Sequence, residues 1–203
     1  MNPSNITGDK LAWKLLAKCN PTDVCQRSKA HYDVALEQYH CICFGQEIII
    51  DLHEKKIGST SSIGKRLADG LDYYFNLAIL WYLINAKELD PSDRLVNPIS
   101  LKGGDIFRKG THVLPLDRLA ARYGQNPENF FASGRDLGGK SLEYGDASLL
   151  LLPFPRIPFT LILWAAEEEF PARTDLLVDS TCELHLPTDV IWSTAMATVL
   201  AML

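Results

Sequence analysis

The chain has 203 residues, of which 47% are hydrophobic, and its formal net charge at pH 7 is -5. This length and composition are enough to bury one substantial core, so we expect a single globular domain over residues 1–203. The acidic balance disfavours binding to nucleic acid or to an anionic membrane, because both usually need a surplus of Lys and Arg. The N-terminal residues contain no continuous apolar run of signal-peptide length, which predicts a cytoplasmic protein.

Two features of the sequence could be mistaken for signs of an extracellular or membrane protein. The five cysteines are an odd number in a chain without a secretory signal, which predicts reduced thiols rather than disulfides. The apolar residues 71–86 are shorter than the ~20 residues of a spanning helix and include Asp72 and Asn76. The apolar residues 149–166 are interrupted by prolines and by Arg156. We therefore expect neither stretch to cross a membrane.

The N-terminal part of the chain is predicted to form helices followed by a β-hairpin. Apolar spacing indicates a helix over residues 7–18, and Asp23 is expected to cap a second helix over residues 24–35. This segment, residues 7–35, should pack on the rest of the domain. Residues 39–44 and 47–52 read as two strands joined by a turn at Gly45 and Gln46. The small polar residues 57–64 are expected to form a mobile loop before the clearest helix, residues 65–87.

The C-terminal part contains the most apolar segment, residues 147–171, which predicts a buried hairpin. Its strands, residues 149–152 and 159–164, should meet at a corner of Pro153, Pro155 and Pro158. Short helices are expected at residues 116–123 and 127–137, a strand at 176–179, and a last helix at 189–202 with Thr188 as its N-cap. The order predicts an α+β fold, with one antiparallel sheet built from the two hairpins and helices mainly on one face.

Several short motifs carry a resemblance to a known family: Gly103-Gly104, Leu137-Gly138-Gly139, Pro155-Arg156-Ile157-Pro158, Trp164, Glu168-Glu169-Phe170-Pro171 and Leu186-Pro187-Thr188-Asp189. In their order and spacing, from about Arg66 to the C-terminus, the chain resembles the DUF3786 family of domains of unknown function. The resemblance implies a bacterial protein, found mostly in anaerobes, with some relatives fused to an iron–sulfur segment of four cysteines. Cys19 and Cys25 depart from that close cysteine spacing, so the resemblance does not assign a cluster to this chain.

Three places in the sequence are candidates for ligand binding. Arg156 is held between prolines, and a guanidinium suits planar anions, although it could instead cap carbonyl groups at the corner. The loop of Lys102, Gly103 and Gly104 could offer backbone amides to an anion, although it lacks a phosphate-binding fingerprint. Glu168 and Glu169 follow the most apolar strand and could meet a cation or a basic partner, or form a solvated turn.

Two further groups are candidates for chemistry. Cys182 and His185 lie three residues apart near Asp179, with Asp189 as the alternative carboxylate, and could form a nucleophile and base. Their alternative is ordinary packing, because no nucleophile elbow accompanies them. Thiolates suit zinc or iron, which makes Cys41 and Cys43 metal candidates, possible partners being His40, Cys19 and Cys25. Their alternative is burial in the core, which is common for free cysteine.

The sequence therefore leads to a binding or accessory module as the first hypothesis for function. It would hold a small anionic molecule or a protein partner through Arg156 and the Gly103-Gly104 loop. The alternatives are a small enzyme using Cys182 and His185, and a protein that handles iron or a corrinoid-type cofactor. The cofactor, the substrate and the oligomeric state are left open by the sequence.

Overall fold

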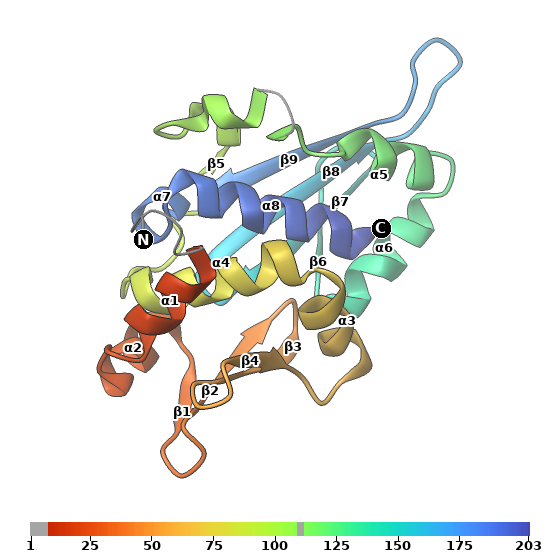
Figure 1. Cartoon of the computed structure of the whole chain (residues 1–203). Coiled ribbons are helices and arrows are strands. Elements are labelled where there is room, and N and C mark those ends of the chain that lie inside the picture. Colours follow the sequence, from red (N-terminus) through yellow and green to blue (C-terminus); the bar gives the residue numbers. More distant parts are fainter. Residues whose placement is uncertain (1–7, 109–111) are drawn as a thin grey trace, which may run out of the picture.

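A computed structural model describes residues 8–108 and 112–203 and confirms the α+β fold (Figure 1). The strands of these residues form two antiparallel sheets. In the first sheet the strands pair in chain order: β1 (His31–Asp33), β2 (Gln38–Cys43), β3 (Gln46–Asp51) and β4 (Lys56–Gly58). In the second sheet the order is β5 (Leu95–Val96), β9 (Arg173–Asp179), β8 (Ile157–Trp164), β7 (Ala147–Phe154) and β6 (Lys140–Leu142).

The helices stack over the sheets. The α-helices are α1 (Gly8–Leu16), α2 (Pro21–Ser28), α3 (Ser62–Gly70), α4 (Asp72–Asn85), α5 (Leu116–Tyr123), α6 (Pro127–Asp136), α7 (Cys182–His185) and α8 (Thr188–Met202), and the 3₁₀ helices are η1 (Pro98–Ser100) and η2 (Gly104–Arg108). Helices α4 and α8 lie side by side in front of the second sheet, and α1 packs on α4 (Figure 1). Ala12 and Leu16 of α1 are fully buried there, and burial of such a leucine contributes roughly 1.5–3 kcal/mol.

The predicted central hairpin is confirmed as β7 and β8. Leu149 pairs with Leu161, Leu151 pairs with Phe159, and these side chains are fully buried. The register shifts between Leu151 and Phe154, where the prolines interrupt the ladder, because proline has no N–H to donate. The hairpin is therefore both the centre of the second sheet and the core against which α4 and α8 pack.

The first hairpin is also confirmed, as β2 and β3, but the two hairpins do not share a sheet as predicted. Among the described residues, a backbone hydrogen bond joins the two hairpins, from the N–H of Phe44 to the carbonyl oxygen of Leu152, at 2.7 Å. Strand β6 pairs with β7 only at residues 148–150. Beyond Leu150 the edge of β7 is not paired with β6. Leu152 lies where the register of β7 and β8 shifts, and its carbonyl oxygen accepts this bond.

The prediction for the second helix was wrong about its N-cap residue and about where the helix ends. The side chain of Asn20, not Asp23, caps α2 and accepts a hydrogen bond from the N–H of Thr22 at 2.9 Å. The helix ends at Ser28 because Lys29 takes the left-handed conformation with φ 58°. The next residues form β1 rather than a further helical turn. Helix α1 forms where predicted but ends at Leu16 rather than at residue 18, and residue 7 lies outside the described residues.

The predicted helix over residues 65–87 is two helices, α3 and α4, which divide at Leu71. Gly70 ends α3, in keeping with the low helix propensity of glycine. The polar loop predicted over residues 57–64, before α3, is shorter in the structure. Strand β4 (Lys56–Gly58) pairs with β3, and Ser61 already caps α3. The oxygen of the Ser61 side chain accepts a hydrogen bond from the N–H of Gly64 at 2.9 Å.

The remaining predicted elements agree with the structure. Helices α5, α6 and α8 and strand β9 form close to their predicted residues. One detail differs, because Thr188 is the first residue of α8, and its hydroxyl donates to the carbonyl oxygen of Lys102 instead of capping the helix. Within residues 8–108 and 112–203, every helix is too short or too polar to span a membrane.

Candidate functional site

Arg156 lies in the corner between β7 and β8, where its side chain is buried and holds two chain segments together. Its Nε donates to the carbonyl oxygen of Arg27 at the end of α2, at 2.7 Å. Its Nη1 donates to Oδ1 of Asp90, also at 2.7 Å, and Lys29 reaches the same carboxylate at 3.0 Å. The guanidinium therefore ties the corner to α2 and to the loop after α4.

The loop of Lys102, Gly103 and Gly104 packs against the start of α8. The N–H of Lys102 donates to Oε2 of Glu183 at 3.0 Å, and its carbonyl oxygen accepts from Thr188. A Cβ at Gly104 would lie 2.4 Å from the carbonyl oxygen of Pro98, so only glycine fits there. The backbone groups that could have faced an anion are thus partly used within the protein.

Glu168 and Glu169 lie in the connection between β8 and β9, and this connection projects from the body of the molecule (Figure 1). Both are exposed, and the turn is closed by a hydrogen bond from the N–H of Glu167 to the carbonyl oxygen of Phe170 at 2.9 Å. Arg156 precedes the opposite end of β8. The structure therefore does not bring Arg156 and these carboxylates into one site.

Cys182, His185 and Asp179 come close in space without forming a catalytic arrangement. Burial, and then the nearby Asp179 carboxylate, raise the pKa of the Cys182 thiol. Nδ1 of His185 accepts from the backbone N–H of Lys87 at 3.2 Å, and no hydrogen bond within the described residues joins this ring to Cys182. A buried thiol with a raised pKa is a poor nucleophile at neutral pH.

Asp179 has a structural use of its own. Burial by itself raises the pKa of this carboxyl, but hydrogen bonds from Thr181 and Ser92 outweigh burial and hold the pKa below its usual value. Its Oδ1 accepts from the hydroxyl of Thr181 at 2.6 Å and from the hydroxyl of Ser92 at 3.0 Å. The ionised carboxylate thereby joins the end of β9 to the loop that precedes β5.

The metal candidates Cys41 and Cys43 point into the core from β2 and are fully buried. Burial, and then the hydrogen bond with Cys41, raise the pKa of the Cys43 thiol well above its usual value. Cys19, between α1 and α2, and Cys25, on α2, are half-buried. In the part of the chain that the structure describes, no three His, Cys, Asp or Glu side chains are grouped so that they could hold a metal ion.

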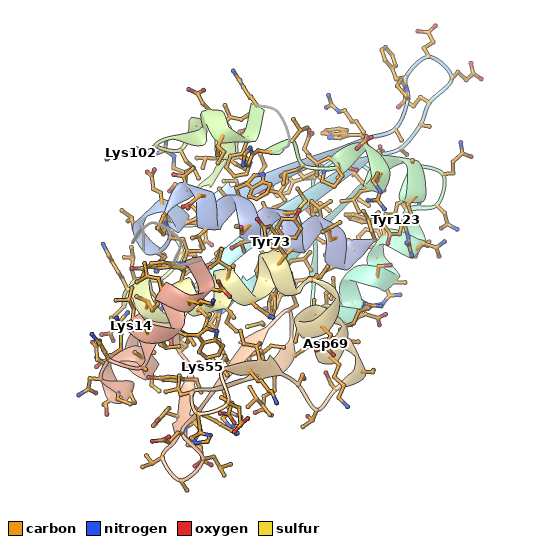
Figure 2. All side chains as sticks on the ribbon, viewed as in Figure 1. Lys14, Lys55, Asp69, Tyr73, Lys102 and Tyr123 are labelled. Carbon is orange, nitrogen blue, oxygen red and sulfur yellow. The ribbon has the colours of Figure 1, made fainter. Side chains whose placement is uncertain are left out.

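One concave feature of the described residues was not anticipated from the sequence. A cleft of about 550 Å³ lies where α1, α4 and α8 meet the turn between β3 and β4. Aromatic side chains line it from three helices: Trp13 from α1, Tyr73 from α4 and Trp192 from α8. Figure 2 labels Tyr73 on α4 and Lys55 in the β3–β4 turn. We call this cleft, with those four side chains, the α1–α4–α8 cleft.

Packing of the three helices fixes the aromatic walls of this cleft. Trp13 follows the buried Ala12, and Trp192 follows the buried Ile191, so each ring emerges beside a core position. Nε1 of Trp192 donates to the carbonyl oxygen of His112 at 2.6 Å, and Tyr74 packs edge-on against Trp192 with ring centroids 5.6 Å apart. The indole of Trp192 is therefore held in place.

Lys55 supplies a cation at the rim of the α1–α4–α8 cleft. It has φ 52°, a left-handed conformation that costs non-glycine residues roughly 1 kcal/mol. Its neighbour Lys56 approaches Glu54 at 3.9 Å, whereas Lys55 forms no ion pair with the described residues. Gly8 and Asp9 of α1 line the same cleft. Asp9 contributes a carboxylate that has interactions of its own.

Sequence reasoning missed this cleft because its walls come from parts of the chain that are far apart. Trp13, Lys55 and Trp192 share no local spacing, and Lys55 reads as one more charge in a polar turn. The available signal was the presence of Trp13 and Trp192 on helix faces that are otherwise small or aliphatic. Packing of those faces does not by itself require a tryptophan.

The fold and the cleft define an α+β protein with two antiparallel sheets and a helical layer that forms a small-molecule-sized cleft. Residues 20–201 match the model of the domain of unknown function DUF3786, and the chain belongs to this family. The match begins well before Arg66, so the resemblance also covers α2 and the first sheet. Comparison with curated proteins gives no match, and neither does comparison with solved structures.

Proposed function

We propose that this protein binds a small organic anion in the α1–α4–α8 cleft. The observation that carries the proposal is the ammonium of Lys55 at the rim of a cleft of about 550 Å³ lined by Trp13, Tyr73 and Trp192. This volume lies within the range of small-molecule sites, which combine apolar walls with a few polar groups. The apolar body of the ligand would pack on the rings, and its anionic group would meet Lys55.

This proposal keeps the expected ligand class and moves its site. Arg156 and the backbone of Lys102 are engaged in hydrogen bonds with other parts of the chain, whereas Lys55 forms no ion pair with the described residues. An anion at Arg156 would have to compete with Asp90, which already contacts the guanidinium at 2.7 Å. The ammonium of Lys55 is exposed and can approach an anion without breaking such a bond.

The enzyme hypothesis has less support in the geometry. Cys182 is fully buried, and its raised pKa keeps the thiol protonated at neutral pH. Neither it nor His185 lines the α1–α4–α8 cleft. A binding or accessory role therefore accounts for more of the described side chains than catalysis by these residues does.

The test compares an organic anion with its neutral counterpart. Benzoate and benzamide are titrated into ¹⁵N-labelled protein, and the indole N–H signals of the tryptophans are followed. We expect benzoate to shift the signals of Trp13 and Trp192 and benzamide to bind more weakly. The indole of Trp164 lies on β8 under Arg173, away from the cleft, and serves as an internal reference.

The variant for this test is Lys55→Gly, with Lys56→Ala as its matched control. Glycine suits the left-handed backbone at position 55, so the variant should be at least as stable as the parent chain. Loss of the ammonium should weaken benzoate by roughly fivefold, the range of a partly exposed ion contact. Lys56→Ala removes an equal charge from the adjacent residue and should leave the affinity for benzoate unchanged. Equal affinity of benzoate for Lys55→Gly and the parent would exclude this site.

A further inference from the structure

A second hollow adjoins the α1–α4–α8 cleft and shares Trp192 with it. This hollow has a volume of about 370 Å³ and lies between α4, η2 and the start of α8. Four residues line both hollows: Gly8, Leu77, Trp192 and Ser193. The two hollows are therefore adjoining compartments of one groove, with Trp192 at their junction.

The second compartment offers a carboxylate beside indole rings, whereas the first offers the ammonium of Lys55 together with the carboxylate of Asp9. The wall of the second compartment contains the indole rings of Trp81 and Trp192 and the carboxylate of Asp189, which is exposed in the first turn of α8. The face of an indole ring attracts a cation, and a carboxylate beside it adds a direct ionic partner. Lys55 does not line this compartment, and Asp189 does not line the first.

Apolar side chains form much of the surface between the two charged ends, beside the shared Ser193. Leu77 is shared by both compartments, Ile106 and Val190 line the second, and Leu80 lines the first. Two contacts with His112 fix the position of Trp192 at the junction. Nε1 of Trp192 donates to the backbone carbonyl oxygen of His112, and the two rings pack edge-on with centroids 4.7 Å apart. A ligand that reaches both ends would therefore pass an aliphatic segment over a held indole.

The geometry points to an extended zwitterion as the ligand: an anionic group at Lys55, an apolar chain across Trp192, and an ammonium group against Trp81 and Asp189. This is the chemistry of ω-amino acids and of short peptides. The inference rests on the proposed anion site and adds to it the cationic end and the extended shape. It assigns Asp189 a direct contact with the ligand.

The experiment uses probes that differ by one charge. Hexanoate carries the anion alone, hexylammonium carries the cation alone, and 6-aminohexanoate carries both. Affinities are obtained from the indole N–H shifts of Trp13, Trp81 and Trp192, with Trp164 as the reference. We expect 6-aminohexanoate to bind about tenfold more tightly than hexanoate, since it adds an ion contact and a cation–π contact. It should also shift Trp81, which hexanoate should leave in place.

Asp189→Asn tests the cationic end without removing a side chain from the first turn of α8. It should abolish the advantage of 6-aminohexanoate over hexanoate and leave the affinity for hexanoate unchanged, which also shows that the groove is intact. The series 4-aminobutanoate, 6-aminohexanoate and 8-aminooctanoate should show a length optimum, because only one spacing satisfies both ends.

The outcomes separate the two proposals. If hexanoate binds, weakens in Lys55→Gly, and 6-aminohexanoate gains nothing over it, the anion site stands and the zwitterion inference is overturned. If Asp189→Asn weakens hexanoate and 6-aminohexanoate equally, the cationic end is overturned as well. If neither hexanoate nor 6-aminohexanoate shifts Trp13 and Trp192, both the anion site and the zwitterion inference fail.

Discussion

Nδ1 of the buried His185 accepts a hydrogen bond from the backbone N–H of Lys87 at 3.2 Å, joining α7 to the segment that follows α4. An imidazole can accept at Nδ1 only while that nitrogen carries no proton. Burial, and then the positive charges of Arg156 and Lys87, lower the pKa of His185, and Asp179 opposes them. The contact therefore requires the neutral ring, and the surroundings favour it.

This arrangement predicts that stability falls as the pH falls below the ordinary histidine pKa of about 6.5. The unfolded chain takes up a proton on His185 at that pH, while the folded chain, with its lowered pKa, does not. The free energy contributed by the neutral ring is complete above about pH 6.5 and is lost as the pH falls through the folded pKa. Urea unfolding at a series of pH values between 7 and 5 measures the slope.

The control for this pH dependence is the exposed His53, for which His53→Gln should retain the parent slope. His185→Gln keeps an acceptor for Lys87 but removes the titrating ring, so its profile should be flatter over the same range. A His185→Gln profile as steep as that of the parent would show that other groups cause the loss.

Arg156 should matter more to stability than the acid that it contacts. Arg156→Ala leaves the carbonyl oxygen of Arg27 without its charged donor in a buried corner, which should cost about 2 kcal/mol of the free energy of unfolding. Asp90→Asn should cost less than Arg156→Ala, because the Asp90 side chain is 77% exposed and water replaces the lost contact. Urea unfolding of both variants checks the order, and similar losses would contradict this assignment of the guanidinium.

Local signals in the sequence were enough to predict β7, β8 and β9 of the second sheet and the α+β class, but not the short edge strands β5 and β6. The apolar run that forms β7 and β8 and the prolines between them act within a few residues, so their consequence can be read directly. The separation of the hairpins into two sheets could not be read this way. It depends on where β6 stops pairing and leaves Leu152 free for Phe44, a contact between residues far apart in the sequence.

The candidate site was harder to predict than the fold. Arg156 was recognised as a constrained charge, but its partners Arg27 and Asp90 come from distant segments, so its engagement was invisible in the sequence. The sequence does not single out Lys55 either. That it is a cation without an ion-pair partner among the described residues, beside aromatic rings, also depends on tertiary packing. The proposed anionic ligand follows from residue type, whereas the position of the groove depends on the packing.

Thiol accessibility gives a direct test of the environments assigned to the cysteines. Iodoacetamide applied to the native protein should modify Cys19 and Cys25, which are half-buried, before the three fully buried thiols. Cys41, Cys43 and Cys182 should react only after unfolding in urea, as read by peptide mass. Rapid native labelling of Cys182 would contradict its raised pKa and would restore it as a candidate nucleophile.

Two glycines in helices offer a matched pair in which the same substitution should have opposite effects. In α6, a Cβ at Gly134 would lie 2.3 Å from Cδ1 of Leu149, so Gly134→Ala should overpack the contact with β7 and cost about 1–3 kcal/mol. In α3, a Cβ at Gly70 would meet only Cγ of Arg66 at 3.8 Å, an ordinary contact. Gly70→Ala should therefore stabilise the protein by about 0.5 kcal/mol through helix propensity. Thermal unfolding of both variants measures the two signs, and a stabilising Gly134→Ala would show that α6 packs less closely on β7 than described.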